Sequence, residues 1–241
     1  MQNKTVFIID AGNSNVKVAH FDSNELTDLK RFPSDDLTLL KNYLSTLSGN
    51  FALSSVLSGD KTNEILAVNK DILLLKTDTP TDMKVSYGTT NTLGMDRLCN
   101  AIYAYKHSKT EYAVVIDVGT CIKFDIVHTT EGYMGGSIAP GIDLRYKALN
   151  DYTGNLPLLS NKSTTNLVGT STHLSIQSGV MNGISAEING MMDRYRERFS
   201  DLTFFMTGGD AQHFDIRTKN DIFADENLTL LGLHEIYQQN A

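Results

Sequence analysis

The stretch that decides the fold is Ile8-Ile9-Asp10-Ala11-Gly12-Asn13-Ser14-Asn15-Val16-Lys17. The apolar residues 6–9 are typical of a buried strand, and Gly12 allows a tight turn after it. The alternation of residues 16–20 then predicts a returning strand that carries Lys17. Such a turn offers backbone N–H groups and an ammonium group to phosphate oxygens, with the Asp10 carboxylate nearby for a cation. Hairpins also carry Asp and Gly for purely structural reasons, so this stretch alone leaves both interpretations open.

The same pattern returns in the second half of the chain as Val115-Ile116-Asp117-Val118-Gly119-Thr120-Cys121-Ile122-Lys123. Each copy consists of an apolar strand, an Asp-x-Gly turn with a small polar residue, and a second strand. A repeated strand–turn–strand unit indicates a duplicated domain. We therefore expect two turns that face each other and hold a polyphosphate between them.

Size and composition restrict the class of protein. The 241 residues fit two ordinary domains or one large one. The formal net charge of −7 and the pI near 5.3 argue against a non-specific nucleic-acid binder, which needs a basic face. Cys99 and Cys121 form no metal-binding pattern, so two free thiols in a cytosolic protein are the simpler explanation. No run approaches the ~20 apolar residues of a membrane helix, and Asp10 interrupts any signal-peptide core. We expect a cytoplasmic protein without nucleic-acid or membrane partners.

Hydrophobic spacing predicts strands and helices in both halves. In the first half, strands are expected at 4–22 (two strands), 25–32, 51–58 and 72–76, and helices at 34–48 and 62–69, which gives the order β-β-β-α-β-α-β. In the second half, strands are expected at 112–116 and 202–206, and helices at 98–107, 142–150 and 175–198. Residues 151–171 have no regular pattern, and residues 227–237 are apolar enough to dock. The apolar stripe of residues 175–192 favours a core or dimer contact over a ligand site.

Three further stretches carry candidate chemistry. Gly94-Met95-Asp96-Arg97 precedes a predicted helix, so Asp96 is either a helix cap paired with Arg97 or a general base at a pocket. The glycine-rich residues 133–141 predict a tight loop, either structural or close to a substrate. Thr207-Gly208-Gly209-Asp210 follows a predicted strand and either admits the sugar or base of a nucleotide or forms an ordinary turn.

Taken together in this order, the motifs resemble the type III pantothenate kinase family, which belongs to the acetate and sugar kinase/Hsc70/actin superfamily. The motifs are Asp10-x-Gly12-Asn13-Ser14-x-x-Lys17, Gly94-x-Asp96-Arg97, Asp117-x-Gly119-Thr120, Gly135-Gly136-x-Ile138-x-Pro140-Gly141 and Thr207-Gly208-Gly209. The resemblance covers almost the whole chain. It implies an α/β fold of two similar RNase H-like domains, built from duplicated ββ-turn units with helices around a nucleotide cleft. The N-terminal domain would span residues 1–110 and the C-terminal domain residues 111–241.

The resemblance also implies an activity, namely ATP-dependent phosphorylation of pantothenate to 4′-phosphopantothenate, the first step of coenzyme A biosynthesis. It implies a transferase that is a homodimer and uses ATP, Mg²⁺ and a monovalent cation, K⁺ or NH₄⁺. Asp96 matches the catalytic base that takes the proton of the pantothenate hydroxyl, and Asp117 matches the carboxylate that binds the monovalent cation. The residues matched to ATP binding are Asp10, Ala11, Gly12, Asn13, Ser14, Asn15, Val16, Lys17 and Thr120. Those matched to pantothenate binding are Tyr87, Gly94, Met95, Asp96, Arg97 and, reaching over from the partner subunit, Thr172.

Two residues depart from the family pattern. Ser14 replaces a common threonine and keeps the hydroxyl group. Lys123 stands where the family usually has a small hydroxylated residue. If residues 121–127 form a strand, Lys123 and Asp125 point to one face. We therefore expect either a surface ion pair with Asp125, or an ammonium group that takes the place of the monovalent cation beside Asp117.

Two other functions stay open at this point. A different small-molecule kinase or a phosphatase of the same superfamily would keep the fold, but would not need Gly94-x-Asp96-Arg97 with Tyr87 upstream. A non-catalytic regulatory binding protein would be indicated by loss of the base, and Asp96 is present.

Overall fold

The computed structural model describes residues 5–163, 165–214 and 222–241. The chain divides into two compact units, which are described one at a time. The first unit comprises Met1–Asp82, Thr89–Tyr103 and Leu228–Ala241, and the second comprises Met83–Gly88 and Ala104–Asn227. The division predicted between residues 110 and 111 stays a prediction. Within the described residues, no helix is long and apolar enough to cross a membrane.

The first unit is built on a five-stranded sheet with the order β3-β2-β1-β4-β5. The bounds are β1 Val6–Ala11, β2 Asn15–Asp22, β3 Glu25–Pro33, β4 Asn50–Ser55 and β5 Ile72–Leu74. Strands β1, β2 and β3 are antiparallel neighbours, whereas β4 and β5 run parallel to β1 and are reached through helices. With α1 (Thr38–Ser45) and α2 (Gly59–Leu66), the predicted order β-β-β-α-β-α-β is confirmed.

The predicted helix over 34–48 is shorter than expected, and α1 begins only at Thr38. The residues before it use their polar side chains to make a turn. The Thr38 backbone N–H donates to Asp36 Oδ1 at 2.9 Å, and the Ser34 hydroxyl donates to the carbonyl oxygen of Asn13. The Asp36 side chain bonds to the backbone next to it and so competes with helix formation, while Ser34 is held by the distant Asn13, which explains the late start.

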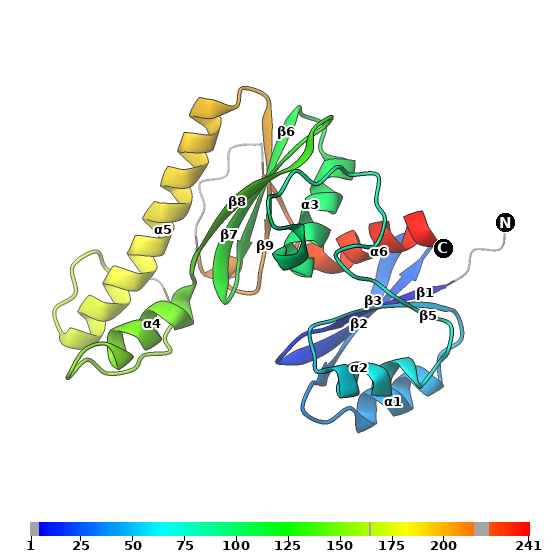
Figure 1. Cartoon of the computed structure of the whole chain (residues 1–241). Coiled ribbons are helices and arrows are strands. Elements are labelled where there is room, and N and C mark those ends of the chain that lie inside the picture. The colour runs from blue at the N-terminus through cyan, green and yellow to red at the C-terminus, as the bar shows by residue number, and fades with distance from the viewer. Residues whose placement is uncertain (1–4, 164, 215–221) are drawn as a thin grey trace. The chain divides into compact units, whose positions relative to one another are not determined.

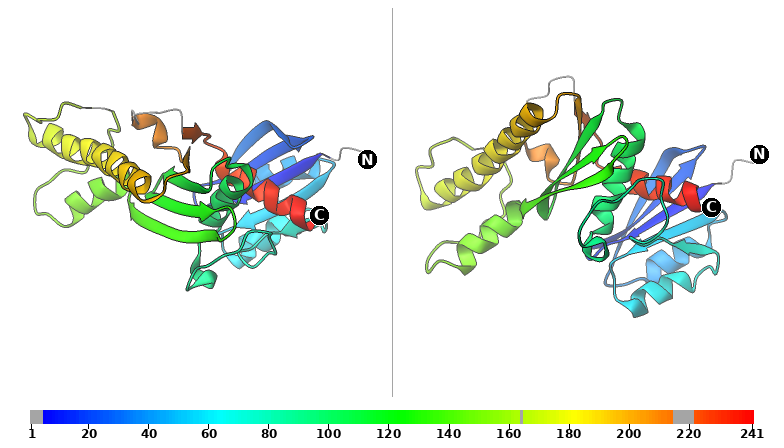
Figure 2. Two further views of the ribbon diagram at one scale, coloured as in Figure 1. Left: turned by 90° about the horizontal axis from the view of Figure 1, so that it is seen from above. Right: turned by 45° about the horizontal axis from the view of Figure 1, so that its top comes forward.

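Both faces of the first sheet are covered. Phe7, Ile9 and Ala11 of β1 point into a core with residues of α1 and α2. Because side chains alternate along a strand, Ile8 and Asp10 point to the opposite face. There α6 (Leu228–Asn240) lies along the sheet, as Figures 1 and 2 show. It packs so closely on α3 (Met95–His107) that a Cβ on Gly232 would lie 2.0 Å from the carbonyl oxygen of Cys99.

The second unit repeats this plan, which confirms the predicted duplication. Its sheet has the order β10-β9-β6-β7-β8, with β6 Tyr112–Val118, β7 Cys121–His128, β8 Gly132–Pro140, β9 Leu202–Thr207 and β10 Ile222–Ala224. The three strands β6, β7 and β8 are antiparallel neighbours, and β9 and β10 run parallel to β6. Strand β6 therefore corresponds to β1, and the turn after it corresponds to the first Asp-x-Gly turn.

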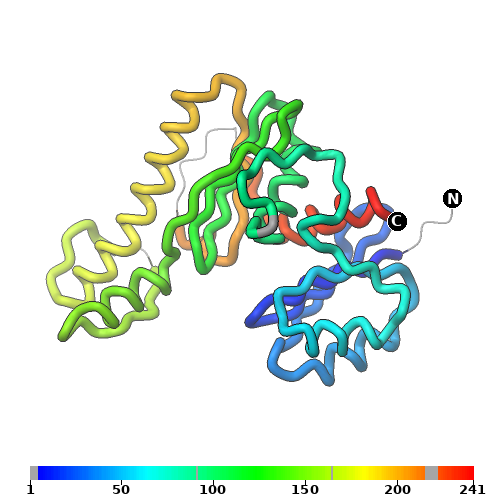
Figure 3. Tube along the Cα trace, viewed as in Figure 1, coloured from blue at the N-terminus to red at the C-terminus, as the bar shows by residue number. Residues whose placement is uncertain are grey.

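Two helices of the second unit extend beyond its sheet as a pair. These are α4 (Ile142–Asp151) and α5 (Thr172–Arg198), and Figures 1 and 3 show the connecting segment returning from the end of α4 to the start of α5. Hydrogen bonds hold this segment to the helices. The Tyr146 hydroxyl donates to the Asn161 carbonyl oxygen at 2.8 Å, and the Ser178 hydroxyl donates to that of Leu167 at 2.6 Å.

The loop predicted for residues 133–141 is wrong, because almost all of this stretch lies in strand β8. Its glycines serve close packing between strands. A Cβ on Gly136 would lie 1.9 Å from the Phe124 carbonyl oxygen, and Gly135 has a positive φ of 116°. Glycine readily meets both the close backbone approach at position 136 and the positive φ at position 135. A strand here can therefore have the composition of a loop.

Candidate functional site

The first Asp-x-Gly turn presents a small polar surface between β1 and β2. Asp10 and Lys17 are register partners on these two strands. The Gly12 backbone N–H donates to the Asn15 carbonyl oxygen at 3.0 Å and closes the turn. The side chains of Asn13, Ser14 and Asn15 are exposed, whereas Ala11 and Val16 lie in the core. The exposed residues can therefore meet a ligand through side chain and backbone, and the two buried ones only through the backbone.

The buried residue Ser34 supports this turn through a hydrogen bond. Ser34 is only 4% exposed, and its hydroxyl donates to the carbonyl oxygen of Asn13. The Lys61 ammonium group of α2 in turn donates to the Ser34 carbonyl oxygen at 2.6 Å. The sequence predicts a helix N-terminus at Ser34 and gives no sign of this contact, because its partner lies 21 residues away.

Asp96 lies in the first turn of α3, in the same unit. Its Oδ1 accepts a hydrogen bond from the Arg97 backbone N–H at 2.9 Å. Gly94 gives this carboxylate its space, because a Cβ at position 94 would lie only 2.5 Å from Asp96 Oδ1. The glycine of the Gly-x-Asp motif therefore permits the observed orientation of the carboxylate. The hydrogen bond from the Arg97 backbone N–H fits the prediction that Asp96 caps the helix. It is also compatible with the prediction that Asp96 is a general base.

The charges of Lys17 and Asp96 both act on the Asp10 carboxylate. Burial raises the pKa of Asp10, the Lys17 ammonium group lowers it, and the charge of Asp96 raises it again. The pKa of the fully buried Cys99 thiol is raised well above its ordinary value, first by burial and then by both carboxylates. The first unit thus brings together the Asp10–Lys17 turn and Asp96, and keeps the neighbouring Cys99 as a neutral thiol.

The second Asp-x-Gly turn is held on two sides. The Gly141 backbone N–H, which lies immediately before α4, donates to the Thr120 carbonyl oxygen at 3.0 Å. On the other side, the Asp210 backbone N–H donates to the Val118 carbonyl oxygen at 3.0 Å. Gly208 has a φ of 98°, and a Cβ there would lie 2.2 Å from the same Val118 oxygen. Thr120 itself remains exposed and can meet a ligand.

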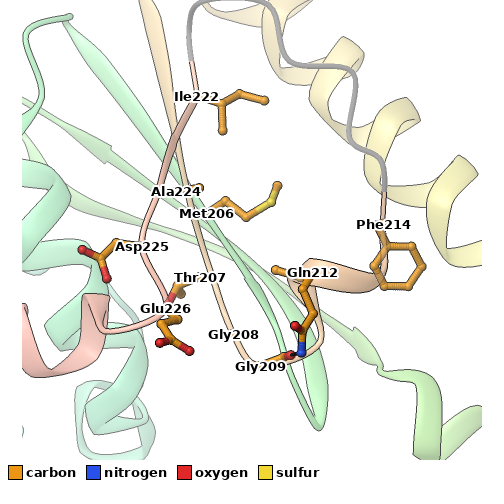
Figure 4. Close-up of a pocket in the computed structure, with 11 residues that line it drawn as sticks. Met206, Thr207, Gly208, Gly209, Gln212, Phe214, Ile222, Ala224, Asp225 and Glu226 are labelled. Carbon is orange, nitrogen blue, oxygen red and sulfur yellow. Dashed lines mark hydrogen bonds between the residues drawn. The ribbon is translucent and has the colours of Figure 1, made fainter. Parts of the chain in front are cut away.

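A cavity of about 450 Å³ opens next to the Gly208–Gly209 turn of the second unit. Figure 4 shows the apolar side chains of Met206 and Ile222 on the strands β9 and β10, and the amide of Gln212 beside Gly209. The Gln212 amide donates to the Gly209 carbonyl oxygen at 3.1 Å. Further lining residues are Thr207, Ala211, Phe214, Ala224, Asp225 and Glu226. The glycine pair is predictable from the sequence, whereas the other walls come from separate segments that no motif marks.

Asp117 and Lys123 face each other across β6 and β7. They are register partners, and the Lys123 Nζ lies 2.7 Å from Asp117 Oδ2. The surface location predicted for Lys123 and Asp125 is wrong, since the Lys123 side chain is only 13% exposed and Asp125 only 1%. The alternation of β7 is as predicted, and Asp125 on the same face accepts the Tyr133 hydroxyl at 2.7 Å.

The remaining predicted residues, Tyr87 and Thr172, lie at two other places of the second unit. Tyr87 lies beside β8, where its ring meets that of Tyr133 edge-on at 5.7 Å, and Gly135 faces it. Thr172 is the first residue of α5 and is exposed at the rim of a groove of about 480 Å³. Leu149, Leu156 and Ile176 supply the apolar lining of this groove.

Comparison with known proteins places these features in a family. A sequence model of type III pantothenate kinase matches residues 6–194. The chain belongs to the type III pantothenate kinase family. The relative from Christiangramia forsetii with that name is 39% identical over 97% of this chain and 98% of its own length. The corresponding protein of Phocaeicola vulgatus is 36% identical over the same shares.

Solved structures are similar in fold. A conserved Campylobacter jejuni protein assigned to the Baf family of transcriptional activators aligns with a TM-score of 0.62, at 23% identity, over 97% of this chain and 98% of that one. A glucokinase from an Antarctic psychrotroph aligns with a TM-score of 0.54, at 11% identity, over 99% and 100%. The kinase fold and the duplicated α/β plan agree with the fold predicted from the sequence.

Proposed function

We propose that this chain transfers the γ-phosphoryl group of ATP to the primary hydroxyl of pantothenate and so forms 4′-phosphopantothenate, the first step of coenzyme A biosynthesis. Membership of the type III pantothenate kinase family over nearly the full length supports the reaction. The observation that carries the proposal is the joint placement of the Asp10–Lys17 turn and Asp96 in one unit, where the charge of Asp96 acts on Asp10. The reaction is cytoplasmic.

In this proposal, the first Asp-x-Gly turn binds ATP phosphates through the exposed residues 13–15, the Gly12 backbone and the Lys17 ammonium group. In the second unit, the exposed Thr120 of the corresponding turn is likewise assigned to ATP. The base and ribose of ATP occupy the cavity beside Gly208 and Gly209, where Met206 and Ile222 offer an apolar wall. Mg²⁺ arrives with the phosphates and neutralises their charge, held mainly by phosphate oxygens and water, with Asp10 as the nearest carboxylate of the first turn.

Asp96 is the base of the proposed mechanism. Phosphoryl transfer depends mostly on alignment and on neutralisation of charge, so the base has only to accept the hydroxyl proton as the new bond forms. Its orientation is set by the Arg97 backbone N–H and by the space that Gly94 leaves. Met95 and Arg97 flank it and line the pantothenate side of the site. Tyr87 of the second unit is also assigned to pantothenate binding; its ring lies edge-on against that of Tyr133, whose hydroxyl donates to Asp125.

We further propose that the enzyme is a homodimer in which Thr172 reaches the pantothenate site of the partner subunit. Large apolar side chains around the start of α5 support this arrangement, because Leu167, Val168 and Leu174 are 80%, 75% and 41% exposed. Along α5, Gly179, Gly183 and Gly190 would each carry a Cβ into open space. They leave a smooth helix surface that a second copy of α5 can approach closely.

The charge of Asp117 also has to be balanced beside the phosphates. We propose that a single positive charge lies at this carboxylate, supplied either by a monovalent cation, K⁺ or NH₄⁺, or by Lys123 in its place.

The experiment that tests the proposed reaction is an assay of ADP release with pantothenate against a panel of small alcohols and sugars. We expect turnover with pantothenate and no comparable rate of turnover with any compound of the panel. The product is identified by its mass. A preference for a sugar would favour another kinase of the superfamily. ATP binding without turnover of any acceptor would favour a regulatory binding protein, the function suggested by the name of the Campylobacter relative.

Mixed subunits test the proposed dimer. Asp96→Asn and Thr172→Val subunits are each expected to be weakly active alone. After mixing and exchange of subunits, part of the activity should return, because some sites of the heterodimer then contain both intact residues. An active enzyme that sediments as a monomer at assay concentration would rule out the shared site.

A further inference from the structure

The ion pair between Lys123 and Asp117 lies directly under the second Asp-x-Gly turn. The position of a Cβ on Gly119 would be 3.6 Å from Asp117 Oδ1, so this carboxylate touches the turn that carries Thr120. The Lys123 Nζ lies 2.7 Å from the other carboxylate oxygen, Oδ2. A positive charge is therefore held next to a turn that we assign to the ATP phosphates.

The sheet fixes this ammonium group in place. Lys123 lies on β7, between β6 and β8, and its register partners are Asp117 and Ile138. Its chain neighbours Ile122 and Phe124 are buried in the core on the opposite face. The side chains of Lys123 and Asp117 are only 13% and 14% exposed. A lysine so enclosed has little of the freedom that makes surface ion pairs weak.

The Lys123 ammonium group takes the place of a monovalent ion at Asp117 Oδ2. It lies within hydrogen-bonding distance of this oxygen, and a second positive charge there would be repelled. An ammonium group carries the same unit charge as K⁺ or NH₄⁺, but it cannot leave the site.

We propose that Lys123 is a built-in replacement for the monovalent cation, so that this enzyme works without exchangeable K⁺ or NH₄⁺. The inference rests on the proposed function, since it assigns the second turn to the ATP phosphates. Lys123 acts there as a positioning residue: it neutralises Asp117 and lets a phosphate group approach the Gly119–Thr120 turn.

Activity in different salts gives the first test. Turnover and the KM for ATP are measured in potassium, sodium and tetramethylammonium chloride of equal concentration. We expect kcat and KM to agree within twofold in all three salts, because the ammonium group is part of the chain. An enzyme that is inactive in tetramethylammonium and activated by potassium in a saturable manner would overturn the proposal.

A second measurement needs no acceptor substrate and so separates this inference from the proposed reaction. The rise in melting temperature caused by Mg·ADP or Mg·ATP reports nucleotide binding alone. We expect equal rises in potassium and in tetramethylammonium. A rise seen only in potassium would contradict the inference even if pantothenate proved to be the wrong substrate. Failure of pantothenate turnover with equal rises would refute the reaction and leave the inference standing.

Lys123→Thr gives the third test, because it restores a small hydroxylated side chain and removes the ammonium group. In tetramethylammonium we expect kcat/KM for ATP to fall at least tenfold, and potassium or ammonium ions to restore most of it. Lys147→Thr is the matched control, since it removes an exposed lysine paired with Asp151 on α4 and should change neither quantity. Undiminished activity of Lys123→Thr in tetramethylammonium would overturn the proposal. So would a loss that no monovalent cation restores, because Lys123 would then do more than replace an ion.

Discussion

Replacement of Gly94 by alanine should damage catalysis while leaving the fold intact. The added Cβ would lie 2.5 Å from Asp96 Oδ1, and ordinary contacts begin at 3.4 Å, so the oxygen must move by at least 0.9 Å. The atom that has to move is the end of a side chain, and Gly94 does not have a positive φ, so the backbone can accept alanine. A misplacement of about 1 Å in a reacting group costs on the order of 100-fold in rate. We therefore expect kcat for pantothenate phosphorylation to fall by roughly two orders of magnitude.

Gly59→Ala is the matched control, because Gly59 is in the same unit, at the start of α2, with open space around the added Cβ. The control should keep full activity and melt at the same or a slightly higher temperature, since alanine favours helices by up to about 1 kcal/mol. Both variants are assayed for ADP release and checked by thermal melting. If Gly94→Ala has the turnover and melting temperature of the wild type, the orientation of Asp96 does not limit the reaction.

Three further predictions concern the first Asp-x-Gly turn, the serine that supports it and the Gly208–Gly209 turn. Gly208→Ala should lower the free energy of unfolding by at least about 2 kcal/mol, because alanine would take an unfavourable positive φ and meet the Val118 backbone; Gly209→Ala, with open space, should melt like the wild type. Ser34→Ala should raise the KM for ATP several-fold and leave that for pantothenate unchanged, whereas Ser45→Ala, at an exposed site, should change neither. Asp10→Asn should abolish activity yet raise the melting temperature at pH 7. Burial raises the folded-state pKa of Asp10 above its ordinary value of 3.8, so ionisation of Asp10 destabilises the fold as the pH rises above 3.8. The higher melting temperature of Asp10→Asn relative to the wild type should therefore vanish as the pH is lowered toward 3.8.

Local patterns made the strands and the two Asp-x-Gly turns predictable. An apolar run followed by Asp-x-Gly needs only its own residues to form a strand and a turn, so both copies, and the duplication they imply, were found in advance. The late start of α1 was not predictable in this way, because Ser34 bonds to Asn13 rather than capping a helix. Strand β8 was missed for the same kind of reason: Gly136 is required by Phe124 on the neighbouring strand, and composition alone suggests a loop.

The candidate site shows the same limit. The sequence could name Asp96 and Lys123, but not what surrounds them. That Gly94 makes room for Asp96 depends on the orientation of one side chain. That Lys123 meets Asp117 depends on the register of β6 and β7, which pairs these two residues directly. Lys162 donates to both Asp143 and Asp210, each at 2.9 Å, and so joins a segment without regular structure to the glycine turn. No sequence motif predicts this bridge.

The central claim is that Asp96, held beside the Asp10–Lys17 turn, accepts the proton of the pantothenate hydroxyl. The most direct measurement compares the formation of 4′-phosphopantothenate by the wild type and by Asp96→Asn, at saturating ATP and pantothenate. The variant keeps the shape of the side chain and loses the proton acceptor, so we expect kcat to fall by roughly 100-fold or more with an unchanged melting temperature and unchanged nucleotide binding. Turnover within a few-fold of the wild type would contradict the claim and leave Asp96 as a helix cap.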